Sequence, residues 1–171
     1  SLLTVALGQL LWLSGASALA VRLAPNFISA IVGIVLLIVG PAIYGVDYFR
    51  FGEGIATPRL FAEGLTFWAL YALIDFQLTT ALILATMATL VHPLMGIAAF
   101  GVGWSFLLVH DRRWIFLGIA GLAGVAAAAI AGVAPFDKLG QTIDSEWLNI
   151  LQARVYYLFP SLWSSRDWSR I

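Results

Sequence analysis

The stretch that decides the fold covers residues 60–109 and reads LFAEGLTFWALYALIDFQLTTALILATMATLVHPLMGIAAFGVGWSFLLV. It contains two acids, Glu63 and Asp75, one histidine, His92, and neither lysine nor arginine. One bilayer crossing takes about 20 apolar residues, so this stretch is long enough to cross more than once. A turn is therefore required, and we predict it at His92-Pro93-Leu94-Met95-Gly96, because proline disfavours helix at the residue before it.

The composition of the whole chain agrees with a membrane location. Of its 171 residues, 61% are hydrophobic and 11% are charged, and the mean hydropathy is strongly positive. In lipid the backbone must form its hydrogen bonds within helices or closed barrels. The apolar runs are continuous and do not alternate, which predicts helices. The predicted fold class is all-α: a polytopic transmembrane helical bundle with a C-terminal interfacial amphipathic segment.

Charge and cysteine content exclude several classes of function. Nine basic and nine acidic residues give a formal net charge of zero, so no nucleic acid is expected as a partner. The absence of cysteine excludes disulfides, thiolate catalysis and cysteine metal sites. No cofactor is predicted, and a divalent metal is left open. The chain begins at Ser1 without methionine and stops directly after an aromatic-rich stretch, so we expect a piece of a longer protein.

About six crossings are predicted, several of them short. Those outside the central stretch are residues 2–21, 27–46 and 114–133. The central stretch allows two long helices, 65–91 and 94–109, or three shorter ones, 60–74, 78–91 and 94–109. We favour three, with a turn at Asp75-Phe76-Gln77, because an unpaired aspartate inside hydrocarbon costs several kcal/mol. Thr57 before Pro58 is typical of a helix start.

The C-terminal part of the chain differs in composition from the rest. Residues 114–133 are rich in alanine and glycine, which lets membrane helices approach closely, so we expect this helix to be packed. Residues 134–171 mix charges with tryptophan and tyrosine, which suits the headgroup zone. The predicted domains are therefore a transmembrane helical bundle, 1–133, and an interfacial aromatic-rich segment, 134–171.

The arginines give a prediction of topology. Arg112-Arg113 lie in a short turn and mark the cytoplasmic side, and Arg22 falls on the same side if there are six crossings. Alternation then places residues 47–59, the His92 turn and the segment 134–171 together on the opposite face.

His92 is the first candidate functional residue. A turn at the membrane face can hold its imidazole toward a polar groove as an acid, a base or a donor to a phosphate oxygen. The structural alternative is a helix break whose histidine caps a backbone carbonyl. His92 and His110 would lie at opposite ends of one helix, which disfavours a shared metal or haem.

The second candidate is a group of acids and arginines at the predicted outer face. Its members are Asp47, Arg50, Glu53, Arg59 and Glu63. Such a group can bind metal-associated phosphate or an array of sugar hydroxyls. The structural alternative is an ordinary i,i+4 ion pair between Arg59 and Glu63.

The third candidate lies in the aromatic tail. Ile143, Trp147, Ile150 and Leu151 recur at helical spacing and predict an amphipathic helix on the membrane surface. After it, Arg154, Tyr157 and Trp163 can form a platform on which sugar rings stack and phosphate pairs. The structural alternative is an aromatic belt at the interface.

Three motifs taken together carry a resemblance to a known group of proteins. They are Thr57-Pro58-Arg59-Leu60-Phe61-Ala62-Glu63, His92-Pro93-Leu94-Met95-Gly96 and the run from Arg154 to Trp163. They resemble uncharacterised bacterial polytopic membrane proteins, which in turn look like C-type membrane glycosyltransferases that use polyprenyl-phosphate sugars. The resemblance spans roughly residues 45 to 168. It implies sugar transfer from a lipid carrier at the outer face of the inner membrane.

This resemblance implies roles for seven residues. Asp47 or Glu53 would act as base on the acceptor hydroxyl, although they match the family's catalytic acid only loosely. His92 and the arginines would stabilise phosphate charge. The implied set is Asp47, Glu53 and His92 as catalytic residues, with Arg59, Arg154, Tyr157 and Trp163 binding substrate.

Two other functions stay open from the sequence. A non-catalytic subunit or scaffold would pack in a larger complex, with other membrane subunits, through the small-residue helix 114–133. A transporter would use Gly40-Pro41 and His92-Pro93 as interruptions of helices that line a substrate path. His92 at the membrane face beside Arg59 and Arg154 favours the enzyme, whereas His92 at mid-depth favours the transporter.

Overall fold

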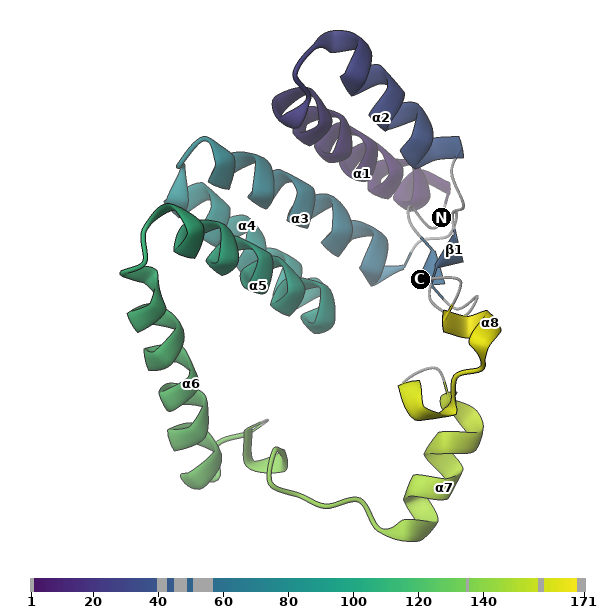
Figure 1. The fold of residues 1–171 in the computed structure, drawn as a ribbon, viewed down its shortest axis with the longest axis vertical. Helices are drawn as coiled ribbons and strands as arrows, with labels where there is room; N and C mark the ends of the chain where they lie inside the picture. The colour runs from purple at the N-terminus through teal and green to yellow at the C-terminus, as the bar shows by residue number, and fades with distance from the viewer. Residues whose placement is uncertain are drawn as a thin grey trace. The chain divides into compact units, whose positions relative to one another are not determined.

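The computed structural model describes residues 2–39, 43–44, 49–50, 57–134, 136–156 and 159–168 (Figure 1). Asp47, Glu53 and Tyr157 lie outside these residues. The chain divides into two compact units, Ser1–Gly103 and Trp104–Ile171. The described residues are helical except for turns and one pair of two-residue strands, which confirms the all-α class. The number of crossings and the domain division after residue 133 stay predictions.

The elements follow one another with short connections. The first unit contains α1 (Leu2–Leu23), α2 (Phe27–Val39), β1 (Ile43–Tyr44), β2 (Phe49–Arg50), α3 (Pro58–Ile74) and α4 (Leu78–Val91). Helix α5 (Pro93–His110) begins in the first unit and ends in the second. The second unit contains α6 (Trp114–Ile130), α7 (Ser145–Arg154), α8 (Ser165–Trp168) and the 3₁₀ turns Phe136–Lys138 and Pro160–Leu162.

The central stretch folds as three helices, as predicted. The Thr57 hydroxyl caps α3 by accepting a hydrogen bond from the Leu60 amide at 3.3 Å, with Pro58 in the first turn. At the other end, Gln77 N–H donates to Ala72 O and Phe76 N–H donates to Leu73 O. This is a Schellman motif. It holds Phe76 in the left-handed region at φ 55°, a conformation that normally favours glycine.

Two predicted helix ends were wrong. Helix α2 stops at Val39, and Ile43–Tyr44 pairs antiparallel with Phe49–Arg50. The reason is Pro41, which lacks an N–H and disfavours helix at the residue before it. Helix α6 stops at Ile130, because Gly132 adopts φ 70° and closes another Schellman motif, with Val133 N–H on Ala128 O.

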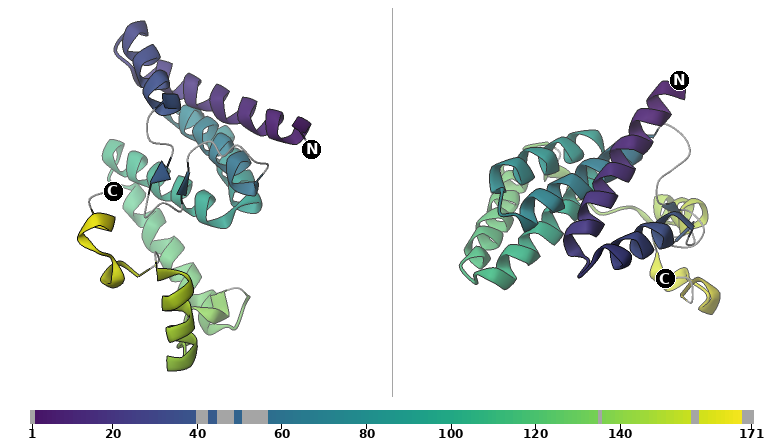
Figure 2. Two further views of the ribbon diagram at one scale, coloured as in Figure 1. Left: turned by 90° about the vertical axis from the view of Figure 1, so that its right-hand side faces the viewer. Right: turned by 90° about the horizontal axis from the view of Figure 1, so that it is seen from above.

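Helices α1 and α3 pack side by side and run parallel (Figures 1 and 2). Their contacts keep a nearly constant sequence offset. Gly8 faces Leu60, Gly15 faces Phe67, and Arg22 pairs with Asp75. Glycines on both helices let the backbones approach closely, because a Cβ on Gly64 would lie 3.0 Å from the Trp12 backbone nitrogen.

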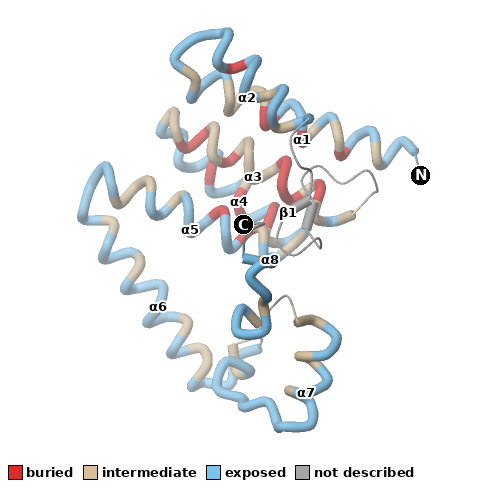
Figure 3. Tube along the Cα trace, turned by 45° about the vertical axis from the view of Figure 1, so that its right-hand side comes forward, coloured by how far each residue is buried: buried red, intermediate tan, exposed pale blue. Residues whose placement is uncertain are grey.

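The interior of the first unit is built mainly from small residues. Among the described residues, nine of the twelve buried hydrophobic residues are alanines. Ala69, Ala85 and Ala99 form one cluster that joins α3, α4 and α5. Large apolar side chains instead face outward, such as Leu36 and Ile97, which are 65% and 63% exposed. Figure 3 shows the buried positions along α1, α3, α4 and α5.

Helices α6 and α7 form no comparable interior. Neither buries any of its residues (Figure 3). The expectation that α6 is packed against other helices stays a prediction. Within 4 Å of a Cβ built on Gly121 or Gly124 there is no neighbouring atom.

Candidate functional site

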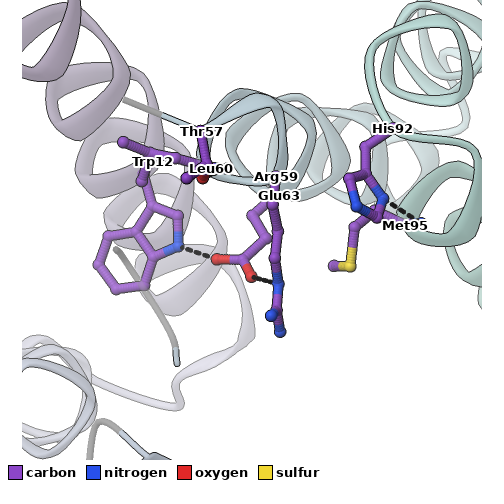
Figure 4. A network of polar contacts seen from close by, with 7 residues as sticks. All are labelled: Trp12, Thr57, Arg59, Leu60, Glu63, His92 and Met95. Carbon is purple, nitrogen blue, oxygen red and sulfur yellow. Dashed lines mark hydrogen bonds and ion pairs between the residues drawn. The ribbon is translucent and has the colours of Figure 1, made fainter. Parts of the chain in front are cut away.

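A carboxylate is buried between α1 and α3. Glu63 is 3% exposed, and each of its oxygens accepts a hydrogen bond from a different residue. Trp12 donates from its indole nitrogen to Oε2 at 2.9 Å, and Arg59 donates from Nε to Oε1 at 3.2 Å (Figure 4). A buried charge is stable only when it is paired and hydrogen-bonded, and both conditions are met here.

Local sequence and helix packing position these three side chains. Arg59 and Glu63 are one helical turn apart on α3, so the predicted i,i+4 ion pair is confirmed. Trp12 reaches them because α1 lies close against α3, and its own ring packs edge-on against Phe67 at 5.8 Å between centroids. In Figure 4 the terminal nitrogens of Arg59 extend beyond the carboxylate.

His92 joins α4 to α5 without an intervening loop. Its backbone N–H donates to Ala88 O at 2.8 Å and so ends α4. Its Nδ1 accepts a hydrogen bond from the Met95 amide at 3.4 Å and so caps the start of α5 (Figure 4). Pro93 occupies the first position of α5, where no N–H is needed. The imidazole therefore caps a backbone amide, and not a carbonyl as the structural alternative supposed.

His92 and the Glu63 network lie at the same level of the helix bundle. Helices α3 and α4 form an antiparallel hairpin that closes between Ile74 and Leu78. Residues that are equally far from this turn in α3 and in α4 lie at the same height, because both helices rise about 1.5 Å per residue. His92 therefore lies level with the first turns of α3, which carry Arg59. We call Trp12, Arg59, Glu63 and His92 the Glu63 end.

The remaining predicted site residues belong to the second unit or lie outside the residues that the structure describes. Arg154 is the last residue of α7 and is exposed. Trp163 follows the turn Pro160–Leu162 and stacks at a tilt against Trp168, with 4.9 Å between the ring centroids. A single rim that includes both units therefore stays a prediction, as do the roles of Asp47, Glu53 and Tyr157.

Sequence reasoning missed Trp12. The residue sits inside an apolar helix, 51 positions before Glu63, and nothing local marks it as polar in function. A usable signal did exist, since a carboxyl in the middle of an apolar run requires a donor, and Trp12 carries one of the few side-chain N–H groups on α1. Among the described residues, no three His, Asp or Glu side chains gather as metal ligands.

Comparison with known proteins gave no match, since no family model, curated protein or solved structure is significantly similar to this chain. The resemblance to C-type membrane glycosyltransferases therefore stays a prediction.

Proposed function

We propose that this chain is a multi-pass integral protein of the bacterial inner membrane. The supporting observation is the inverted distribution of side chains, with alanines buried and large apolar residues exposed. Water does not tolerate such a surface, whereas lipid does, and small residues are those at which membrane helices pack. Helices α1 and α5 are long and apolar enough to cross a bilayer. The shorter apolar helices α2, α4 and α6 would cross where the bilayer is locally thin.

The reaction that we propose is sugar transfer from a polyprenyl-phosphate carrier at the Glu63 end. The acceptor hydroxyl attacks the anomeric carbon as the bond from that carbon to the phosphate oxygen breaks. Asp47 or Glu53 takes the hydroxyl proton, and the departing phosphate keeps the electron pair. Arg59 and His92 support this proposal, because both can donate to the phosphate oxygens as charge builds up there.

Arg59 and His92 carry the kinds of hydrogen-bond donor that this reaction needs. Glu63 engages Arg59 through Nε, and the guanidinium carries further N–H groups on its two terminal nitrogens. His92 uses Nδ1 as an acceptor, so Nε2 is the ring nitrogen that can donate to a phosphate oxygen. The position of His92 at the ends of α3 and α4 favours this enzyme over a transporter.

The test distinguishes a loss of sugar transfer from a loss of folded protein. His92→Asn replaces the imidazole with an amide oxygen that can still cap α5, and Arg59→Lys keeps the charge but loses the fork of donors. The full-length protein with either change, or with Arg154→Ala, is expected at normal level with sharply reduced transfer of sugar from the lipid carrier. Measured together with cell-envelope glycan, normal transfer in all three variants would remove the enzymatic proposal.

A second candidate is a non-catalytic subunit of a larger membrane complex. The observation that favours it is α6, whose glycine positions 121 and 124 have no neighbour within 4 Å. Because the chain has no cysteine, Gly121→Cys provides a unique thiol for crosslinking in native membranes. This candidate predicts a specific crosslink from position 121 to another chain and none from Leu139→Cys. It also predicts that His92→Asn leaves the complex functional.

A further inference from the structure

The α1–α3 pair has a second polar end, where an open cavity lies at the surface. It has a volume of about 520 Å³ and is lined by Ser17, Ala18, Val21, Arg22, Ala24 and Tyr71. Ala18 and Arg22 are one turn apart on α1, as are Ser17 and Val21, so one helix face supplies most of the wall. Tyr71 contributes to its lining from α3. We call this region the Arg22 end.

Three of the residues that line this cavity carry hydrogen-bond donors. They are the Ser17 hydroxyl, the Tyr71 hydroxyl and the Arg22 guanidinium. Within the described part of the chain, neither hydroxyl has a hydrogen-bond partner. Arg22 uses only Nε, which donates to Asp75 Oδ1 at 2.7 Å. The two terminal nitrogens keep the planar fork that matches a phosphate.

Neighbouring residues hold both key side chains in place. Asp75 fixes Arg22 through the Nε contact. The Tyr71 ring packs edge-on against Trp68, with centroids 5.6 Å apart, and Trp68 Nε1 in turn donates to Ser14 Oγ at 3.3 Å. A site whose donors are fixed before binding loses less conformational entropy when the ligand arrives.

The apolar part of the lining favours a lipid as the source of a phosphate ligand. Ala18, Val21 and Ala24 are apolar, and Arg22 stands in the last turn of a helix long enough to cross a membrane. A phospholipid carries a phosphate directly next to its apolar acyl chains, at the depth of the membrane headgroups.

We propose that Arg22, Ser17 and Tyr71 form a binding site for the phosphodiester of an anionic phospholipid. The inference rests on the membrane location proposed above, and it is independent of sugar transfer. Under the predicted topology the site faces the cytoplasmic leaflet, where anionic lipids interact with basic residues next to membrane helices.

The experiment uses the full chain in nanodiscs of phosphatidylglycerol and phosphatidylcholine, with native mass spectrometry of the lipids retained after release. Wild type is expected to retain phosphatidylglycerol over phosphatidylcholine. Arg22→Gln should reduce this retention roughly tenfold or more, because a charged donor is lost. Tyr71→Phe should reduce it about threefold to tenfold, because one neutral hydrogen bond is lost. Arg112→Gln, which removes an arginine from a different turn, should leave it unchanged.

Several outcomes would overturn the proposal. Equal retention of both lipids by wild type, or equal retention by wild type and both variants, would exclude a specific site. Displacement of the lipid by excess inorganic phosphate would assign the cavity to a soluble phosphate instead. Failure of the chain to enter nanodiscs at all would contradict the membrane location, whereas normal insertion without selective retention contradicts only the lipid site.

Discussion

The two ends of the α1–α3 pair each carry one arginine–carboxylate pair, and the two pairs differ in burial. At the Glu63 end the side chains of Arg59 and Glu63 are 13% and 3% exposed, with 3.2 Å between Nε and Oε1. At the Arg22 end the side chains of Arg22 and Asp75 are 49% and 27% exposed, with 2.7 Å between Nε and Oδ1. The closer pair is the more exposed one.

The distance between donor nitrogen and carboxylate oxygen is therefore a poor guide to the energy of an ion pair. Solvent screens an exposed pair, which then contributes between zero and about 1 kcal/mol. A buried pair adds little net stability compared with apolar residues, but loss of one partner leaves a desolvated charge behind. Single substitutions should therefore have large effects at the Glu63 end and small effects at the Arg22 end.

The largest effect is expected for Glu63→Ala. The change leaves the Arg59 guanidinium without its carboxylate and removes the acceptor of the Trp12 indole, at a cost of about 3–5 kcal/mol in the free energy of unfolding. Chemical denaturation in detergent micelles measures this quantity. The conservative variant Glu63→Gln keeps an acceptor oxygen and should lose clearly less.

A double variant tests whether the uncompensated charge causes this loss of stability. Glu63→Met combined with Arg59→Met replaces both charges with apolar side chains, so its stability should return close to that of wild type. If the double variant is as unstable as Glu63→Ala, the hydrogen bonds themselves provide the stability and the argument from an uncompensated charge is wrong.

A smaller effect is expected for Gly64→Ala, which tests why the Glu63 end is buried. The added Cβ would lie 2.8 Å from Leu11 Cγ and 3.0 Å from the Trp12 backbone nitrogen, so α1 must move away from α3. Overpacking of this kind costs about 1–3 kcal/mol. It should also change the fluorescence of Trp12 as the Trp12–Glu63 hydrogen bond lengthens.

The matched control lies on α6. Gly121→Ala adds the same Cβ at a helical position with no neighbour within 4 Å, so it should be neutral or raise helix stability by up to about 1 kcal/mol. Equal destabilisation by both substitutions would contradict the close approach of α1 to α3.

The third effect concerns the cap at His92. His92→Ala removes the acceptor of the Met95 amide and should cost about 1 kcal/mol, as loss of a helix N-cap does. His92→Asn should restore most of that stability. If the two variants have equal free energies of unfolding, Nδ1 does not cap α5. The variant His92→Asn is then no longer a test of catalysis at the Glu63 end.

The helices of the central stretch could be predicted because their signals are local. Thr57-Pro58, Asp75 and His92-Pro93 each mark a helix boundary within a few residues. Helices α3 and α4 begin and end at these places, and α5 begins at the last of them. The end of α2 was missed, since its apolar sequence outweighed Pro41 in the prediction. The packing of α6 stays a prediction, because small residues show that a helix can pack without showing what covers it.

The candidate site was only partly predictable. The Arg59–Glu63 pair follows from helical spacing, and the His92 turn follows from Pro93. The contact of Trp12 with Glu63 depends instead on the register of two helices 51 residues apart in sequence, which Gly8, Gly15 and Gly64 set through close packing. A single sequence does not show which glycine faces which helix.

The smallest effect is expected for Arg22→Ala, which should change the free energy of unfolding by less than about 1 kcal/mol. A double-mutant cycle of Arg22→Ala with Asp75→Ala measures the coupling between the two side chains directly. The same cycle with Arg59 and Glu63 should give a coupling several times larger, despite the longer distance. If the Arg22–Asp75 coupling is the larger of the two, distance outweighs burial in this bundle and the comparison between its ends must be reversed.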